Sequence, residues 1–132
     1  MQKQQKIFFI VIGVLVLALI VTAFFRSSSV VNESGKYDEF AICLKEKGAV
    51  FYGTFWCKYC QKQKELFGAS VKLIPYEECS TADGKAQTQI CKDKDIKSYP
   101  TWIFADGSIL KGVVPLSELA EKTNCELPNE SL

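Results

Sequence analysis

The sequence contains no histidine among its 132 residues, and this absence excludes several kinds of site. Haem attachment requires Cys-X-X-Cys-His, but Gln61 follows the cysteine pair Cys57 and Cys60. Catalytic Ser-His and Cys-His pairs are excluded for the same reason. A block of basic residues is also lacking, and the net charge is only +1, so we expect no binding to nucleic acid.

Cysteine is abundant by contrast, with six residues in this short chain. That number is typical of a protein in an oxidising compartment, where disulfides form and persist. The length allows one small domain and a short additional segment. A domain of this size has a small core, so covalent cross-links would help to stabilise it.

One long hydrophobic run, residues 7–25, carries no charged residue. As a helix it would be about 28 Å long, close to the roughly 30 Å of a bilayer core. We predict an uncleaved transmembrane signal anchor at residues 7–26. The alternative is a cleaved signal peptide, with Val21 and Ala23 as the candidate cleavage positions. A buried core helix is disfavoured because the remaining domain is too small to surround it.

The charges that flank this run predict its orientation. Lys3 and Lys6 precede it, and positive charges favour the cytoplasmic side of a membrane. We therefore predict a cytoplasmic N-terminus and a domain outside the cytoplasm, in the periplasm or at the cell surface. The expected divisions are a cytoplasmic segment at 1–6, the anchor at 7–26, a polar linker at 27–35, a globular domain at 36–126 and a tail at 127–132.

Hydrophobic periodicity and turn residues predict the elements of the domain. We expect a helix beginning near Tyr37 and ending at Gly48, a buried strand at 49–55, a helix from Cys57 to Gly68, a strand at 71–76, a helix at 85–94, a hairpin of 101–104 and 109–114 around Asp106-Gly107, and a last helix after Pro115. Pro75 places the second strand at a sheet edge. This order predicts an α/β fold with a four-stranded mixed sheet flanked by helices.

The Cys-X-X-Cys pair lies where the buried strand ends and a helix begins. Unpaired N–H groups and the helix dipole at such a helix N-terminus favour a thiolate at Cys57. Thiolates are the attacking species in disulfide exchange. A zinc ribbon would need a second Cys-X-X-Cys pair, which the sequence does not contain. We predict a redox-active dithiol of Cys57 and Cys60; a zinc site and a purely structural disulfide are the alternatives.

Four segments together resemble the thioredoxin-like domain that is fused or paired with bacterial and plant homologues of vitamin K epoxide reductase. They are "FYGTFWCKYCQKQKELFG", "YEECS", "SYPTW" and "LSELAEKT", and the resemblance covers roughly residues 37 to 125. It implies a thioredoxin-like fold and thiol–disulfide exchange, with Cys57 as the exposed nucleophile and Cys60 as the resolving cysteine. It also implies a cis Pro100 beside the disulfide, a Tyr99 backbone that pairs with an extended substrate, and Trp56 packed beside the sulfurs.

One position departs from thioredoxins, which carry a buried acid six residues before the first cysteine. Phe51 occupies that position here. Lys58 and Tyr59 lie between the cysteines, and we expect them to tune the redox couple, since a cation beside Cys57 stabilises its thiolate. The family therefore suggests an oxidant, similar in role to DsbA, that donates disulfides to secreted proteins. A quinone-linked membrane oxidase, similar to vitamin K epoxide reductase or DsbB, would reoxidise it.

Two other functions remain open from the sequence. One is an extracytoplasmic reductase for apocytochrome c or for wrongly paired disulfides. The other is a non-enzymatic metal chaperone of thioredoxin fold, which the absence of histidine ligands disfavours. We expect no cofactor and no metal, protein thiols as substrates, and a membrane-anchored monomer.

The remaining cysteines can pair in three ways: they are Cys43, Cys79, Cys91 and Cys125. In a thioredoxin-like topology, Cys79 and Cys91 become neighbours at the active-site edge of the sheet, whereas Cys43 and Cys125 meet at the opposite end. We therefore predict structural disulfides 79–91 and 43–125, and the matched family carries an extra pair that corresponds to 79–91. A relay of electrons from 79–91 to the active pair is the alternative role.

Overall fold

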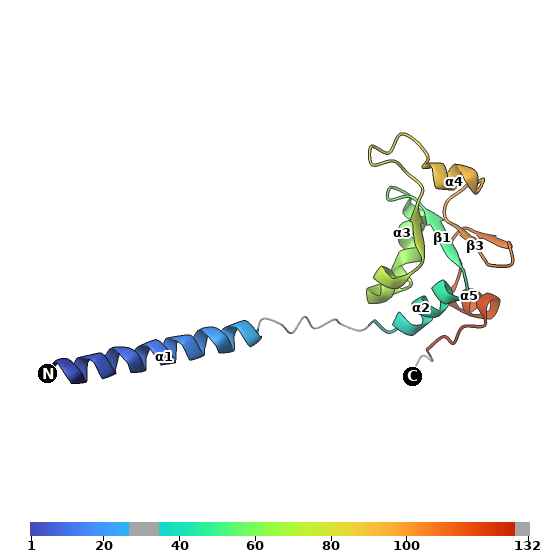
Figure 1. The fold of residues 1–132 in the computed structure, drawn as a ribbon. Coiled ribbons are helices and arrows are strands. Elements are labelled where there is room, and N and C mark those ends of the chain that lie inside the picture. The colour runs from blue at the N-terminus through green and yellow to red at the C-terminus, as the bar shows by residue number, and fades with distance from the viewer. Residues whose placement is uncertain (27–34, 129–132) are drawn as a thin grey trace. The chain divides into compact units, whose positions relative to one another are not determined.

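The computed structural model describes residues 1–26 and 35–128, and the side chains of 23–26 are outside this description (Figure 1). The chain forms two compact units, Met1–Asn32 and Glu33–Leu132. Most of the predicted linker and most of the predicted tail lie outside the described residues. Their boundaries therefore stay predictions.

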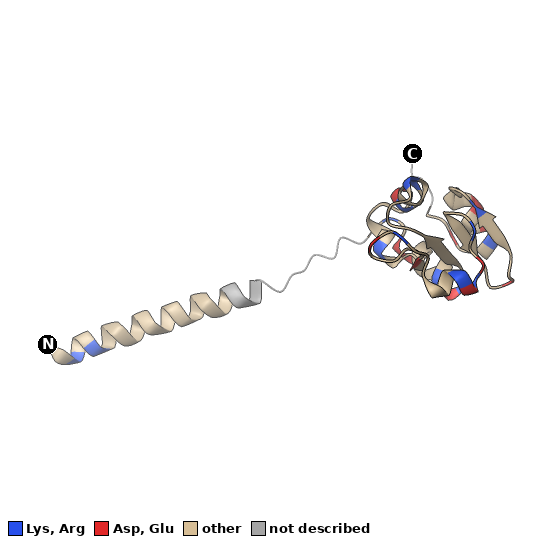
Figure 2. Ribbon diagram, turned by 90° about the horizontal axis from the view of Figure 1, so that it is seen from above, with Lys and Arg blue, Asp and Glu red and all other residues tan. Residues whose placement is uncertain are grey.

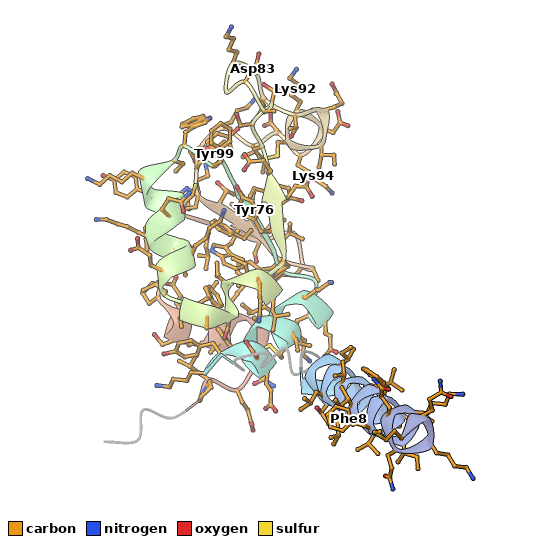
Figure 3. The ribbon with its side chains drawn as sticks, turned by 90° about the vertical axis from the view of Figure 1, so that its left-hand side faces the viewer. Phe8, Tyr76, Asp83, Lys92, Lys94 and Tyr99 are labelled. Carbon is orange, nitrogen blue, oxygen red and sulfur yellow. A yellow bond between two sulfur atoms is a disulfide. The ribbon has the colours of Figure 1, made fainter. Side chains whose placement is uncertain are left out.

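The first unit contains helix α1, Gln2–Arg26. Its segment Gln2–Thr22 contains an 18-residue stretch with a mean hydropathy of 2.5, and the segment is long and apolar enough to cross a membrane. Figure 2 shows that the described basic residues of α1 lie close to its N-terminus. Large apolar side chains such as Phe8 project from the helix and are exposed (Figure 3). Membrane anchors and signal sequences share these properties, which support a membrane-directed segment.

The second unit is built on a four-stranded mixed sheet flanked by helices, which confirms the predicted fold class. Its elements are α2 (Asp38–Glu46), β1 (Val50–Gly53), α3 (Lys58–Glu65), the 3₁₀ helix η1 (Gly68–Leu73), β2 (Tyr76–Glu78), α4 (Gln89–Asp93), β3 (Thr101–Ile103), β4 (Ile109–Lys111) and α5 (Leu116–Thr123). The strand order is β2-β1-β3-β4. Strand β1 pairs in parallel with β2 and antiparallel with β3, and β3 pairs antiparallel with β4.

The predicted strand at 71–76 is wrong over most of its length. Residues 68–73 form η1, and the strand begins only at Tyr76. The hydroxyl of Ser70, which is fully buried, accepts a hydrogen bond of 3.0 Å from the Tyr37 backbone N–H. This bond joins η1 to the start of the domain, so a tertiary contact outweighs the strand preference of the β-branched residues. Strand β2 does lie at a sheet edge, directly after Pro75.

Two predicted helices are shorter in the structure. Helix α3 ends at Glu65 rather than at Gly68, and the helix expected at 85–94 is reduced to α4. The preceding residues form a loop that is closed by an antiparallel bridge between Ser80 and Gln87. This loop therefore lies between β2 and α4, next to the end of the sheet that carries the cysteine pair.

Stacked aromatic rings fill the core between the sheet and the helices. Phe51 on β1 is paired with Trp102 on β3, and their rings are stacked with centroids 5.0 Å apart. Phe40 and Phe67 are stacked at 6.0 Å, and all four side chains are buried. Such ring pairs contribute about 0.5–1.5 kcal/mol beyond their area burial. They anchor β1, whose C-terminal end carries the cysteine pair.

Two disulfides close the domain. Cys43 is bonded to Cys125, with the Cα atoms 5.9 Å apart, and Cys79 is bonded to Cys91, with the Cα atoms 5.5 Å apart. This is the same pairing that the thioredoxin-like topology predicts. The first joins α2 to the segment after α5, and the second joins the residue after β2 to α4. Cross-links of this kind compensate for the small core of a domain of this size.

Candidate functional site

The cysteine pair is positioned by the junction of β1 and α3. Cys57 is the N-cap residue of α3, with extended φ and ψ angles of −77° and 113°. Its backbone N–H donates to the Thr54 carbonyl at 3.2 Å, and its Sγ accepts from the Cys60 backbone N–H at 3.2 Å. A helix N–H thus points at the Cys57 sulfur, in the geometry that stabilises a thiolate at a helix N-terminus.

Both cysteines of the pair are thiols in the structure, and both are buried. The expectation of an exposed Cys57 is wrong, because only 7% of this residue is accessible to solvent. Its N-cap position places the sulfur against the Cys60 N–H rather than out in solution. Cys60 is completely inaccessible, so Cys57 is still the member of the pair that a substrate reaches more readily.

The buried Cys60 thiol resists ionisation. Burial, followed by the hydrogen bond with Cys57, raises its pKa to about 12. A backbone hydrogen bond from Thr54 and the positive charge of Lys64 act in the opposite direction. The pair therefore combines one sulfur at a helix N-terminus with a second sulfur that loses its proton with difficulty.

Gly53 allows Cys60 to approach the neighbouring strand. A Cβ atom at position 53 would lie 2.9 Å from Cys60 Sγ, closer than Cβ atoms pack, and 3.1 Å from Cε2 of Tyr76, which is a tight contact. Only glycine therefore leaves room for both side chains at this point. Sequence analysis did not identify Gly53, because a strand-end glycine carries no pattern of its own.

A tyrosine–glutamate pair on β2 also escaped the sequence analysis, although it lies within the quoted segment "YEECS". The Tyr76 hydroxyl donates to Glu78 Oε2 at 2.7 Å. The other oxygen, Glu78 Oε1, accepts from the backbone N–H groups of Phe55 at 3.2 Å and Ser80 at 2.9 Å. Burial, followed by this bond with Glu78, raises the pKa of Tyr76 far above its ordinary value. The phenol therefore stays protonated.

Trp56 lies at the surface rather than in the core. Its side chain is 56% exposed, its indole N–H donates to Ser80 Oγ at 3.0 Å, and its ring meets the Tyr99 ring edge to face at 6.1 Å. The Tyr99-Pro100 peptide bond is cis. The Tyr99 hydroxyl accepts from Gln87 Nε2 at 2.7 Å, so the loop before α4 supports this tyrosine.

A recess of about 180 Å³ lies next to these residues and next to a structural disulfide. Its lining includes Thr54, Trp56, Cys79, Gln87 and Tyr99. The recess lies beside the end of β1 that leads to the cysteine pair. A larger hollow of about 820 Å³ lies at the opposite end of β1, at Ala49 and Val50, and so is remote from the chemistry.

The residues between the cysteines point outward. Lys58 and Tyr59 are both exposed, and Tyr59 is 59% accessible. A lysine one turn away, Lys62, lies 5.8 Å from the centre of the Tyr59 ring. Within residues 1–26 and 35–128, no group of three or more potential ligands from cysteine, aspartate and glutamate is arranged to hold a metal ion.

Comparison with known proteins relates the domain to disulfide exchange. No protein-family model matches the chain. The chain is similar to the thiol-disulfide oxidoreductase LTO1 of Arabidopsis thaliana, with 43% identity over 88 aligned residues, and the match covers 64% of this chain and 23% of that protein. The chain thus spans about a quarter of the length of this curated relative. The chain is a homologue of a thiol–disulfide oxidoreductase, which confirms the thioredoxin-like resemblance.

Proposed function

We propose that the chain is a membrane-anchored, extracytoplasmic thiol–disulfide oxidoreductase that donates disulfides to secreted proteins. The observation that carries this proposal is the contact between the two cysteines. Cys57 Sγ, at the N-terminus of α3, accepts the backbone N–H of the buried Cys60 at 3.2 Å. The helix N-terminus favours the thiolate form of Cys57, and a second sulfur lies next to it. Such a pair is suited to reversible disulfide exchange.

The proposed reaction starts from the Cys57–Cys60 disulfide. A substrate thiolate attacks Cys57 Sγ, a mixed disulfide forms, and Cys60 leaves as a thiolate that takes up a proton. A second substrate thiolate then attacks the substrate sulfur of the mixed disulfide, and Cys57 leaves as a thiolate. The substrate loses two electrons and gains a disulfide, while the pair Cys57 and Cys60 becomes the reduced dithiol.

The surroundings of the pair suggest how a protein substrate binds. An extended segment would lie along the backbone of Tyr99 beside the cis Pro100, with the exposed Trp56 ring next to it. Lys58 and Tyr59 would tune the couple from the exposed side of the pair. Pro100 itself is fully buried, so it would shape the surface through the backbone rather than through its ring.

The proposed partner is a membrane oxidase that reoxidises the dithiol. The resemblance to domains that accompany vitamin K epoxide reductase homologues suggests a quinone-linked enzyme, either of that kind or similar to DsbB. The partner's own disulfide would accept the two electrons from Cys57 and Cys60. Helix α1 would keep the domain at the membrane surface where such a partner lies, with the basic end of the helix at Lys3 and Lys6 in the cytoplasm.

One observation favours the alternative function, a disulfide reductase. The pKa of Cys60, raised to about 12, makes this thiol a poor leaving group when the 57–60 disulfide is opened. The reduction potential of the couple decides between the two directions. We expect a value well above the roughly −270 mV of thioredoxin for an oxidant, measured for the full chain in redox buffers by trapping the thiols. A value at or below that of thioredoxin would contradict the oxidase and favour the reductase.

A further inference from the structure

A positive charge that acts on the buried Cys60 sulfur comes from helix α3 itself. Lys64 follows Cys60 by one turn of α3, so the two side chains share one face of the helix. Its Nζ atom lies 3.5 Å from the centre of the Tyr76 ring, and the residue is half-buried. The positive charge lowers the pKa of Cys60, against the larger effect of burial. Lys64 is thus held where its charge acts on the buried sulfur.

The ring that holds Lys64 is itself fixed from two directions. The Tyr76 hydroxyl donates to Glu78, and Glu78 accepts from the backbone N–H of Phe55, which precedes α3, and from that of Ser80, which follows β2. Tyr76 and the Cys60 sulfur also converge on the space left by Gly53. The Tyr76 ring on β2 is therefore held in place where it meets the ammonium group of Lys64. A cation over the face of an aromatic ring is attracted to that ring.

We propose that Lys64 is a positioning residue of the exchange reaction, whose ammonium group, held on the Tyr76 ring, stabilises the Cys60 thiolate. The titratable groups around Cys60 are Cys57 at the start of α3, Lys64 on α3, and the Tyr76–Glu78 pair on β2. Among these groups, Lys64 supplies the positive charge. The inference rests on the proposed function, because it concerns the second sulfur of that reaction.

The same thiolate appears in both directions of the exchange. When a mixed disulfide on Cys57 is resolved, the Cys60 thiol gives its proton to water and its thiolate attacks Cys57 Sγ. The Cys57–Cys60 bond forms, the bond to the substrate breaks, and the substrate leaves as a thiolate that takes up a proton. When a substrate opens the disulfide instead, Cys60 leaves as the thiolate. Lys64 therefore assists both oxidation and reduction.

The test follows the two thiols that the reduced protein releases from a small disulfide. The full chain in detergent micelles is mixed with glutathione disulfide over a range of pH. The first glutathione is released when Cys57 attacks, and the second when Cys60 resolves the mixed disulfide. In Lys64→Gln we expect the second release to slow by about threefold or more at neutral pH, because a smaller fraction of Cys60 is ionised.

A matched control and two further variants separate charge from structure. Lys62→Gln removes a lysine of the same helix that lies near the Tyr59 ring, and we expect the second release to keep its wild-type rate. Lys64→Arg should restore the rate, and Tyr76→Leu, which removes the ring, should slow it as Lys64→Gln does. The difference between wild type and Lys64→Gln should also shrink at high salt, since ions screen a partly exposed charge.

Two results would overturn the inference and can be told apart. If wild type releases no glutathione from Cys57, the proposed function itself fails and the inference fails with it. If the first release is normal but Lys64→Gln and Lys62→Gln resolve at the same rate, the inference alone is contradicted. Failure of Lys64→Arg to restore the rate would likewise show that the ammonium charge is not what assists Cys60.

Discussion

Phe51 on β1 is paired with Tyr76 on β2, and their rings lie 5.2 Å apart at an angle of 53°. Phe51 occupies the position at which thioredoxins carry a buried acid. The polar group near the buried sulfur therefore comes from the neighbouring strand, where Tyr76 is bonded to Glu78. Phe51 thus contributes an apolar ring to the core cluster that contains both cysteines, and the protonated phenol of Tyr76 lies near Cys60. These two side chains are therefore part of the surroundings in which the thiols of Cys57 and Cys60 ionise.

Trapping experiments test the order of attack. In Cys60→Ser, a mixed disulfide on Cys57 cannot be resolved, so we expect substrate proteins to stay covalently attached. In Cys57→Ser we expect no attachment, because Cys60 is completely inaccessible. Non-reducing gels of the two variants expressed in cells would show the difference. Equal trapping by both variants would contradict the assignment of Cys57 as the nucleophile.

Lys58→Glu tests the redox tuning by the residues between the cysteines. We expect a wild-type reduction potential between about −230 and −150 mV, and a decrease of some tens of millivolts in this variant. The reason is that a negative charge near Cys57 destabilises its thiolate and so the reduced form. Lys92→Glu, on α4, is a control with the same charge change. A potential that is equal in both variants would show that Lys58 is only solvated.

Removal of each structural disulfide should destabilise the domain to a different extent. The Cys43–Cys125 bond closes a sequence separation of 82 residues, and the Cys79–Cys91 bond one of 12. In the chain-entropy model these are worth about 4 and 3 kcal/mol of unfolding free energy. Double alanine variants of each pair, unfolded in denaturant, would measure the two losses. If the Cys79 and Cys91 variant stays folded but cannot oxidise substrates, that disulfide relays electrons instead.

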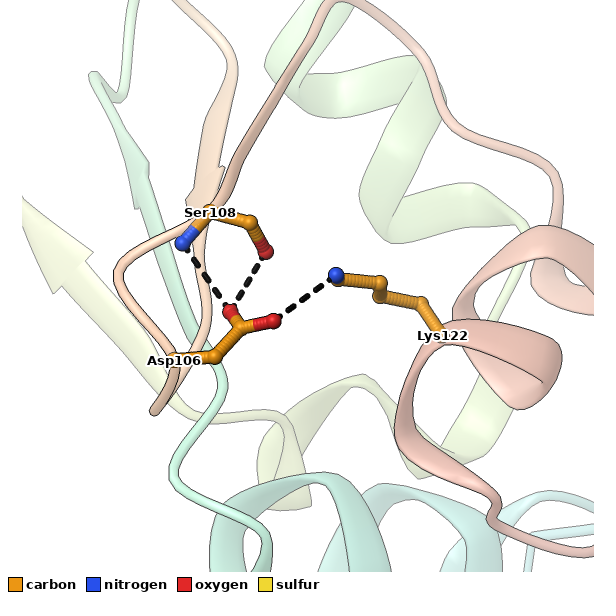
Figure 4. Close-up of polar contacts among 3 residues, drawn as sticks. All are labelled: Asp106, Ser108 and Lys122. Carbon is orange, nitrogen blue, oxygen red and sulfur yellow. Dashed lines mark hydrogen bonds and ion pairs between the residues drawn. The ribbon is translucent and has the colours of Figure 1, made fainter.

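An aspartate in the β3–β4 turn predicts a pH dependence of stability (Figure 4). Asp106 accepts hydrogen bonds from the Ser108 hydroxyl at 2.6 Å and the Ser108 N–H at 2.9 Å, and its other oxygen pairs with Lys122 at 2.9 Å. The Ser108 bonds, followed by Lys122, hold the pKa of Asp106 well below its ordinary value. Its contribution to stability is therefore complete above the ordinary carboxyl pKa and is lost as the pH falls through the lower, folded-state pKa.

Asp106→Asn tests this contribution. We expect a small decrease in melting temperature at neutral pH and a smaller difference from wild type in strong acid, because acid removes the same charge from the wild-type protein. Glu126→Gln, at another exposed position, serves as the control. Melting curves followed by circular dichroism over a pH series would record both. An effect of Asp106→Asn that does not depend on pH would mean that hydrogen-bond geometry alone matters.

The orientation of α1 can be tested in intact cells. If the basic end of the helix stays in the cytoplasm, an external protease should reach residues 36–132 without permeabilisation. An epitope placed before Lys3 should be protected under the same conditions and serves as the internal control. Protection of the domain until the membrane is broken would reverse the proposed topology. Release of the domain into the medium would instead indicate a cleaved signal peptide.

Patterns among neighbouring residues were sufficient to predict those elements that neighbouring residues stabilise. The length of the uncharged run predicts α1, and the change from a β-rich run to a charged helix places Cys57 at a helix N-terminus. The Asp106-Gly107 turn is correctly predicted as well, since Gly107 has a φ of +78° that favours glycine. Each of these features depends on neighbouring residues in the chain, so the sequence alone determined them.

Tertiary structure decided what depends on residues far apart in the chain. Residues 68–73 form a helix rather than a strand because Ser70 is bonded to Tyr37, 33 positions away. Cys57 is buried, although the resemblance to the thioredoxin-like family implied an exposed nucleophile. Lys64 meets Tyr76 only because β1 and β2 pair in parallel with one particular register, which brings the strand and the helix α3 together. Hydrophobic periodicity predicts that such a sheet forms, but long-range packing selects which side chains meet across it.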